Sequence, residues 1–210
     1  IRDRFRRGLI YRGLQPVNLG AISTNLSELD IVYGGGEKLE STLREAYRRF
    51  SPKAIFVTTS CASGIIGDDI EEIATQMEEE LGIPIIPIFC EGFRSKIWTT
   101  GFDACYHGVL RKLVKPPREK QEDVINIFHF TNELTFTPLL AKLGLRPRYL
   151  IQHATVEELS QISDAAATAN MCETLCTYIA KGLEQEYGVP EVKSPPPYGL
   201  ESVSYTHLTL

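Results

Sequence analysis

The strongest constraint on the fold is a regular alternation between short apolar runs and longer amphipathic segments. The runs have the length and β-branched content of buried strands, whereas the segments repeat apolar residues at helical spacing. Single helices between consecutive strands indicate right-handed crossovers and parallel sheets. We therefore predict an α/β fold with Rossmann-like parallel sheets flanked by helices. The expected strands are 30–35, 54–59, 84–89, 124–130 and 148–152, and the expected helices are 37–50, 68–81, 97–113, 132–143 and 170–187.

A polar, proline-bearing stretch, "KPPREKQED" (115–123), interrupts this alternation and has the composition of a linker. We predict a first α/β domain at 1–114 and an incomplete second α/β domain at 124–200. Because the chain opens on Ile1 in mid-pattern, we expect a fragment with a truncated N-terminus. The closing "VSYTHLTL" (203–210) does not continue the pattern, and we expect it to be an artefactual tail.

Charge and cysteine usage exclude several classes of protein. A formal net charge of −5 argues against nucleic-acid and anionic-membrane partners, and no apolar run approaches the roughly 20 residues of a bilayer span. Five widely spaced cysteines without a Cys-x-x-Cys pair do not form a secreted disulfide framework or a local zinc or ferredoxin site. They fit a reducing cytoplasm, and any metal cluster needs ligands from distant segments or another chain.

Cys61 stands in a run of small residues directly after the predicted strand at 54–59. The run "SCASGIIGDD" (60–69) places Gly64 and Gly67 near the cysteine. Small residues let backbone amides approach a bulky inorganic ligand, and the thiolate, which a helix N-terminus favours, is the form that binds iron. The other interpretation is a small buried hydrophobe at a tight turn. The residues alone leave both open.

Four motifs appear here in the order they have in component 1 of nitrogenase. They are "DIVYGGGEKL" (30–39), "TTSCASGIIGDDIEEI" (58–73), "PIFCEGFRS" (87–95) and "LEQEYGVP" (183–190). The chain thus resembles the alpha-type subunits of the nitrogenase component 1 superfamily, over roughly residues 8–200.

The resemblance implies roles for several residues. The cysteine before "IGDD" ligates the iron–sulfur cluster between two subunits, the P-cluster, which assigns that role to Cys61, with Gly64 beside the cluster. Counting back from "EYGVP", Cys172 falls where the family places the cysteine that binds one end of an iron–molybdenum-type cofactor. From the residues alone, Cys172 and Cys176 could both be core residues on one helix face; we predict Cys172 as the ligand and Cys176 as packing. Cys90 matches a family cysteine that is buried rather than ligating.

The chain also departs from the family pattern near the expected cofactor. The segment "SKIWTTGFDACYHG" (95–108) places Trp98 and Phe102 where dinitrogen-reducing subunits have a glutamine and a cofactor-bonding histidine. Losing such donors changes the potential and proton supply of a cluster. The resemblance also implies two further cluster cysteines before Ile1 and a cofactor histidine beyond Leu210.

Three functions follow as hypotheses. The first is an alpha-type subunit of a nitrogenase-like oxidoreductase, which passes electrons from an ATP-dependent iron protein through an iron–sulfur cluster to a substrate-reducing cofactor. Its partners would be a beta-type subunit, in a heterotetramer, and the iron protein; since the chain has no Walker A motif, nucleotide hydrolysis would belong to that partner. The second is a non-catalytic scaffold for cofactor assembly. The third is an α/β ligand-binding module without metal.

Overall fold

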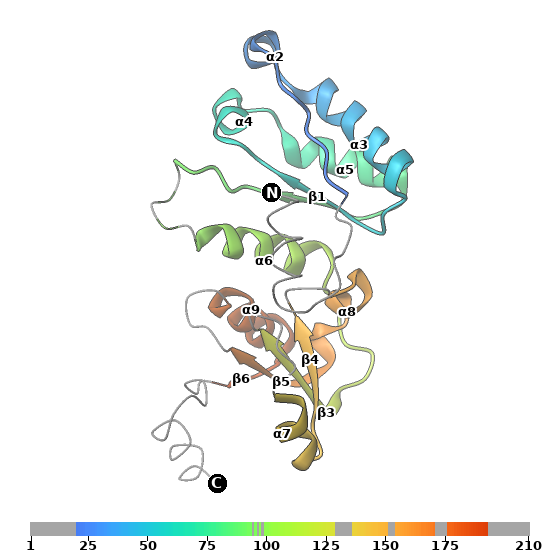
Figure 1. Ribbon diagram of the computed structural model, residues 1–210, viewed down its shortest axis with the longest axis vertical. Coiled ribbons are helices and arrows are strands. Elements are labelled where there is room, and N and C mark those ends of the chain that lie inside the picture. The colour runs from blue at the N-terminus through green and yellow to red at the C-terminus, as the bar shows by residue number, and fades with distance from the viewer. Residues whose placement is uncertain are drawn as a thin grey trace. The chain divides into compact units, whose positions relative to one another are not determined.

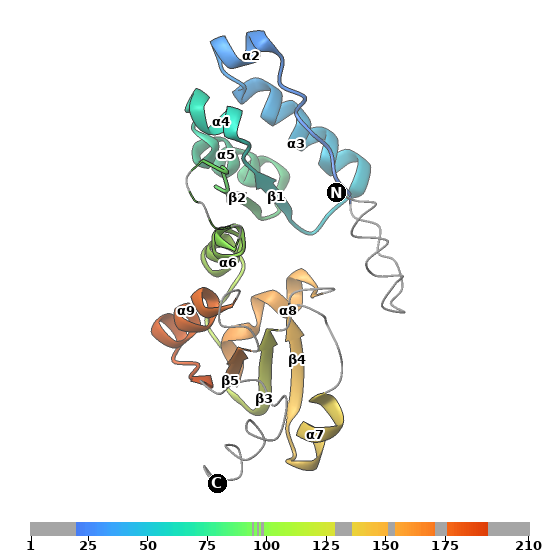
Figure 2. The same cartoon turned by 60° about the vertical axis from the view of Figure 1, so that its left-hand side comes forward.

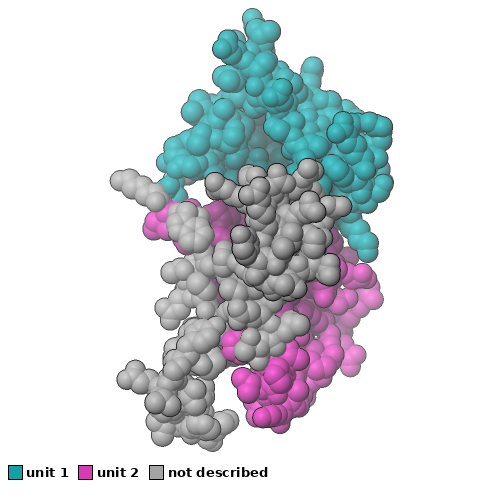
Figure 3. Space-filling view, in the orientation of Figure 1, with its two compact units in different colours: residues 1–96 teal, residues 97–210 magenta. Residues whose placement is uncertain are grey.

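The computed structural model describes residues 20–93, 95, 97, 99–128, 136–150, 154–170 and 176–192. The chain divides into two compact units, residues 1–96 and 97–210 (Figure 3). Each unit has its own parallel sheet (Figure 1), which confirms the predicted α/β class with parallel sheets flanked by helices. Within the described residues, no helix has both the length and the apolar character needed to cross a bilayer.

The first unit is built on two parallel strands, β1 (Ile55–Thr58) and β2 (Ile85–Ile88), paired in register from Ile55–Ile85 to Thr58–Ile88. The amphipathic helices α3 (Gly36–Phe50) and α5 (Ile70–Leu81) supply apolar side chains to its core. The buried centre of this core consists of Leu43, Ala74, Met77 and Ile85. These elements lie where the sequence predicted them.

Two predictions in the first unit are wrong. The segment expected as a strand at 30–35 begins with a helix, α2 (Glu28–Tyr33). Ser27 and Asp30 form a reciprocal capping box there, in which Asp30 accepts from the Ser27 backbone N–H at 2.5 Å. Local capping therefore outweighs the β-propensity of the "IV" pair. The residues expected as a loop around Cys61 form a second short helix, α4 (Cys61–Ile66).

The second unit holds a four-stranded parallel sheet in the order β4-β3-β5-β6. The helix α9 (Thr177–Tyr187) packs against β5 and β6, and α7 (Thr137–Lys142) packs against β4. The helix α6 (Thr100–Lys112) packs against α9 and lies beyond the carboxyl ends of the strands (Figures 1 and 2). Two short elements, α8 (Val156–Ser160) and η2 (Ile162–Asp164), precede β5. The strands are β3 (Gln121–Phe128), β4 (Arg146–Leu150), β5 (Ala165–Asn170) and β6 (Glu191–Val192).

The elements of the second unit differ from the sequence prediction in three places. The strand β5 was not predicted, because its sequence "AAATAN" has one β-branched residue, Thr168, and none of the aromatic residues typical of strands. The helix expected at 170–187 begins only at Thr177 and ends, as predicted, at Gly188, whose φ is +65°. The strand β3 starts at Gln121, so the last residues of the stretch predicted as a linker are strand.

Candidate functional site

The Cys61 segment is fixed to the end of the first sheet by one buried threonine. Thr59 follows β1 and is 8% exposed. Its Oγ1 donates to the Ile88 carbonyl oxygen at 3.2 Å and accepts from the Cys90 backbone N–H at 3.0 Å. The chain after β1 and the chain after β2 are thereby held side by side at the carboxyl edge of the sheet, which is where parallel sheets bind their ligands.

Ser60 then caps the short helix that begins with Cys61. Its Oγ accepts from the Ser63 backbone N–H at 3.2 Å, and the Ser63 Oγ accepts from the Ser60 N–H at 2.8 Å. Cys61 is the first residue of α4 and is exposed. The interpretation of Cys61 as a small buried hydrophobe is therefore not what the structure shows, and its thiol is accessible for ligation.

Position 64 has no room for a larger residue than glycine, because the segment that carries Glu91 lies close to it. A Cβ added to Gly64 would lie 2.5 Å from the Cγ of Glu91, a side chain that is only 4% exposed. On the same segment, a Cβ on Gly92 would lie 3.6 Å from the Cys61 Sγ. The thiol thus faces the Gly92 backbone. The role of Gly64 beside a cluster stays a prediction; the contact with Glu91 is a second reason for a glycine that sequence reasoning missed.

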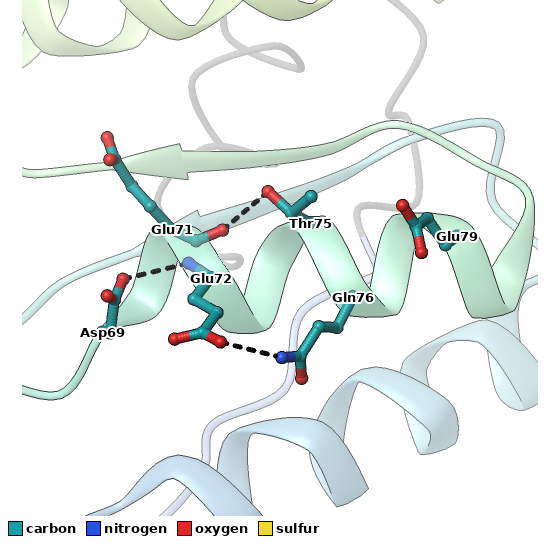
Figure 4. Close-up of a pocket in the computed structure, with 6 residues that line it drawn as sticks. All are labelled: Asp69, Glu71, Glu72, Thr75, Gln76 and Glu79. Carbon is teal, nitrogen blue, oxygen red and sulfur yellow. Dashed lines mark hydrogen bonds between the residues drawn. The ribbon is translucent and has the colours of Figure 1, made fainter.

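Asp68 joins two of the sequence motifs. Its carboxylate oxygens accept from the Gly35 backbone N–H at 3.1 and 2.9 Å. Only Asp69 caps α5, accepting from the Glu72 N–H at 3.0 Å (Figure 4). The "GGG" of one motif is therefore hydrogen-bonded to the "IGDD" of another. These two motifs, which are distant in the sequence, are neighbours in the fold.

Large apolar side chains are exposed on the two short helices at this edge. The helices α2 and α4 pack against each other, as Figures 1 and 2 both show. Neither helix has a buried residue. We call these side chains, together with Phe93 after β2, the apolar rim: Leu29 is 68% exposed, Val32 73%, Tyr33 84%, Ile65 76% and Phe93 56%.

Cys90 differs from the sequence prediction. It was expected to be buried, but it is exposed. Its Sγ contacts the Thr59 carbonyl oxygen at 3.6 Å. The prediction failed because the residue follows β2 immediately, at the open edge of the sheet, rather than lying within the strand.

The predicted cofactor ligand Cys172 lies outside the described residues, in the interval between the end of β5 at Asn170 and Cys176. Trp98 also lies outside them. Cys176, predicted to be a packing residue, is fully buried, and its Sγ contacts the Phe128 carbonyl oxygen at 3.9 Å. That contact places it at the carboxyl edge of the second sheet.

Aromatic side chains of α6 lie over this edge. Phe102 and Tyr106 are four residues apart on one helix face, with ring centroids 6.5 Å apart. The Tyr106 ring meets Phe128, the last residue of β3, edge to face at 5.6 Å. Burial first, and the neighbouring Cys176 thiol second, raise the pKa of the Tyr106 phenol well above its usual range. Tyr106 therefore stays protonated at neutral pH.

A polar group is also buried in the second sheet. Asn126 and Phe128 alternate onto the same face of β3. Asn126 is fully buried; its Nδ2 donates to the Ile162 carbonyl oxygen at 2.7 Å and approaches the Thr168 Oγ1 at 3.5 Å. Its Oδ1 meets no hydrogen-bond partner within the described part of the chain. The Tyr106 hydroxyl, by contrast, has the Cys176 thiol as a hydrogen-bonding neighbour.

Two further features of the described residues add no site. A shallow depression in the first unit is lined by residues from one stretch of the chain, the start and exposed face of α5, and none of the predicted ligands lies there (Figure 4). Among the described residues, no three His, Cys, Asp or Glu side chains gather closely enough to hold a metal ion. The described part of the Cys61 edge thus offers a ligand but not a whole ligand set.

Comparison with known proteins identifies the family. The sequence profile of the nitrogenase component 1 type oxidoreductases matches residues 2–207. The chain is 31% identical to the nitrogenase molybdenum-iron protein alpha chain of Methanosarcina barkeri, over 82% of this chain and 34% of that protein. It is 32% identical to the nitrogenase iron-molybdenum cofactor biosynthesis protein NifE of Methanococcus maripaludis, over 81% of this chain and 37% of that protein.

The solved structures agree. The structure of "Nitrogenase Cp1 at pH 6.5" matches with a TM-score of 0.74 and 30% identity, over 87% of this chain and 36% of that one. The chain therefore spans little more than a third of the length of these relatives.

Proposed function

Because this chain belongs to the nitrogenase component 1 type oxidoreductase family, we propose that it forms part of the alpha-type subunit of a nitrogenase-like reductase. In this proposal Cys61 and Gly64 border an iron–sulfur cluster shared with a beta-type subunit, and Cys172 anchors an iron–molybdenum-type cofactor. When bound, these groups supply electron storage and transfer. An ATP-dependent iron protein in the cytoplasm is the proposed electron donor.

The observation that carries the proposal is the exposed thiol of Cys61. A cysteine kept only for packing is normally among the most buried residues, whereas Cys61 is exposed at the first position of α4. Thr59, Ser60 and Asp68 hold the backbone on both sides of it. The chain's own contribution is therefore to present one thiol at a fixed place, while the remaining ligands come from elsewhere.

The apolar rim supports a protein partner at the same edge. Exposed apolar side chains that gather on a folded protein mark interaction sites, and three of these, Val32, Tyr33 and Ile65, are more than 70% exposed. A beta-type subunit or an iron protein that covers the rim would also exclude water from the neighbourhood of Cys61, which strengthens electrostatic interactions at a redox centre.

The alternative function, a scaffold for cofactor assembly, is favoured by one specific observation. Phe102 stands at the position of a hydrogen-bonding histidine in dinitrogen-reducing relatives; its ring carries no hydrogen-bonding atom and lies 6.5 Å from that of Tyr106, centroid to centroid. The 32% identity to NifE, beside 31% to an alpha chain, supports this alternative to the same degree. A scaffold would release its cofactor, whereas a reductase would retain it.

Metal analysis of cysteine variants tests the proposal. The protein is expressed anaerobically from its complete gene with a beta-type subunit, and iron, molybdenum and vanadium are quantified in wild type, Cys61→Ala and Cys172→Ala. We expect iron to fall in both variants and the heterometal to fall only in Cys172→Ala. Iron that is unchanged in both variants would contradict the proposal.

The same preparations separate the two functions. A heterometal that remains bound to the wild-type complex through dialysis favours the reductase. A heterometal that passes to an added apo-reductase favours the scaffold. Cys176→Ala is the matched control, because Cys176 is a buried packing residue four positions from Cys172 and its loss should leave both metals in place.

A further inference from the structure

Two exposed thiols lie at the carboxyl edge of the first sheet, and the proposed function uses only one of them. Of the four cysteines that the structure describes, Cys61 and Cys90 are exposed, whereas Cys105 is partly exposed and Cys176 is buried. Each exposed cysteine stands shortly after one strand of the pair β1 and β2. A cysteine that serves only packing is normally buried, so the exposure of Cys90 calls for a reason.

Hydrogen bonds keep the two chains adjacent beyond the ends of the strands. The strands are paired in parallel as far as Thr58 and Ile88. The Thr59 backbone N–H then donates to the Ile88 carbonyl oxygen at 3.0 Å, and the Thr59 Oγ1 accepts from the Cys90 N–H at 3.0 Å. Neighbouring strands lie about 4.8 Å apart, and a disulfide joins Cα atoms about 4.4–6.8 Å apart. The spacing of neighbouring strands therefore suits a disulfide between their ends.

Each sulfur lies against the chain that carries the other cysteine. The Cys90 Sγ is 3.6 Å from the carbonyl oxygen of Thr59, two residues before Cys61. The Cys61 Sγ is 3.6 Å from the position that a Cβ on Gly92 would take, two residues after Cys90. Because both cysteines are exposed, a small oxidant can reach either sulfur.

We propose that Cys61 and Cys90 form a reversible disulfide in the metal-free chain. The oxidant is a low-molecular-weight disulfide of the glutathione class. One cysteine sulfur attacks it, which breaks the S–S bond of the oxidant, forms a mixed disulfide and releases one small thiol; the second cysteine sulfur then displaces the other small thiol. Two cysteines are oxidised and one small disulfide is reduced, and the two cysteine protons leave on the two small thiols. An excess of small thiol reverses the reaction.

The disulfide does not require the proposed function, but its consequence for iron does. Metals bind cysteine as the thiolate, so a Cys61 sulfur that is bonded to Cys90 is not available as a ligand. If Cys61 ligates iron as proposed, the disulfide blocks iron loading at this edge and its reduction restores loading. Cys90 is then the residue that makes the ligand redox-sensitive.

Peptide mapping of the metal-free complex tests the proposal. The complex is prepared anaerobically from the complete gene with a beta-type subunit, its iron is removed by a chelator, and oxidised glutathione is added. Cleavage after glutamate separates the two cysteines, because Cys61 then lies in residues 46–71 and Cys90 in residues 81–91. We expect these peptides to be linked, in about tenfold excess over glutathionylated Cys61, because a neighbouring thiol reacts faster than a second free one. Dithiothreitol should separate them.

Cys90→Ser and Cys105→Ser are the matched variants. Cys90→Ser removes the second sulfur, so the linked peptides should vanish and glutathione should remain on Cys61. Cys105→Ser makes the same change at a partly exposed cysteine of the second unit, and should leave the linked peptides as in wild type. Iron uptake from ferrous iron and sulfide is then compared between oxidised wild type before and after reduction, and we expect uptake to rise several-fold on reduction.

The failure of this inference and the failure of the proposed function give different results. If metal-free wild type shows no linked peptides, this inference is overturned and the proposed function stands. Linked peptides that persist in Cys90→Ser would also overturn it, since the partner of Cys61 would then be another cysteine. Linked peptides together with iron uptake that does not change on reduction would support the disulfide and contradict the ligand role of Cys61.

Discussion

The two sheets present the same kind of edge in opposite environments. In the first unit, the carboxyl edge of the strands carries an exposed thiol, Cys61, and a rim of exposed apolar side chains. In the second unit, the corresponding region is buried and holds the Tyr106 phenol, the Asn126 amide and the Cys176 thiol. An open edge suits a group completed by another chain, whereas a buried edge suits a group enclosed by this one.

The largest expected effect is on bound iron, when one cysteine at each edge is replaced by serine. Cys61→Ser should lower bound iron several-fold and barely change the free energy of unfolding, because the side chain is exposed. Cys176→Ser should leave iron in place and destabilise the protein by about 1–3 kcal/mol, because it buries a hydroxyl in a fully enclosed site. Iron analysis and urea denaturation of both variants measure this contrast. An equal iron content in the two variants would contradict the proposed difference between the edges.

A smaller effect is expected at Gly64. Gly64→Ala places a Cβ 2.5 Å from the Glu91 Cγ, so the buried side chain must move and the stability should fall by about 1–3 kcal/mol. Gly101→Ala is the control, because no atom lies within 4 Å of its added Cβ. Alanine is the better helix former, so that variant should gain about 0.5–1 kcal/mol. Equal urea midpoints for the two variants would show that the Glu91 side chain can move away from the added Cβ without loss of stability.

The anchoring of the open edge by Thr59 should have a similar or slightly smaller effect. Thr59→Val leaves the Cys90 N–H without its acceptor, and we expect a loss of about 1–2 kcal/mol in the free energy of unfolding. Thr75→Val removes an exposed hydroxyl that donates to the Glu71 carbonyl oxygen, and should change stability by less than about 0.5 kcal/mol. Thermal melts of the pair suffice, and a neutral Thr59→Val would break the argument that this residue fixes the edge.

The smallest effect is a pH dependence at α2. The side-chain hydrogen bond from Lys38, and then the one from Ser27, hold the pKa of Asp30 well below its ordinary value of 3.8. A carboxylate with a depressed pKa adds stability above that ordinary value and loses it as the pH falls further. The difference in urea midpoint between wild type and Lys38→Met should therefore shrink from pH 7 to pH 3. If the difference in urea midpoint stays constant with pH, the Lys38–Asp30 ion pair is not its source.

The fold class was predictable because periodicity reports burial, and α3, α5, β1 and β2 lie where it placed them. The secondary-structure predictions were wrong where local capping or long-range strand pairing outweighs the apolar periodicity of the sequence. A capping box at Ser27 turned an expected strand into α2, and the alanine-rich β5 forms because it lies between β3 and β6. Such neighbours are not visible in a single sequence.

The candidate site was predictable to a similar extent. The cysteine in its run of small residues marked the first edge, but spacing carries no information on exposure, and only the structure shows that Cys61 is exposed rather than buried. Tyr106 gave no signal in the sequence, since an aromatic residue on an amphipathic helix ordinarily belongs to the core. Its place beside Phe128 and Cys176 is known only from the packing of α6 against β3 and the start of α9.

The central claim, that Cys61 is a metal ligand at an edge covered by a partner, is tested most directly by its reactivity in the assembled complex. The complex is treated anaerobically with iodoacetamide before and after iron is removed by a chelator, and modification is quantified by peptide mass spectrometry. We predict that Cys61 is protected before chelation and modified after it, while the buried Cys176 stays unmodified in both states. Equal modification of Cys61 before and after iron removal would contradict the claim.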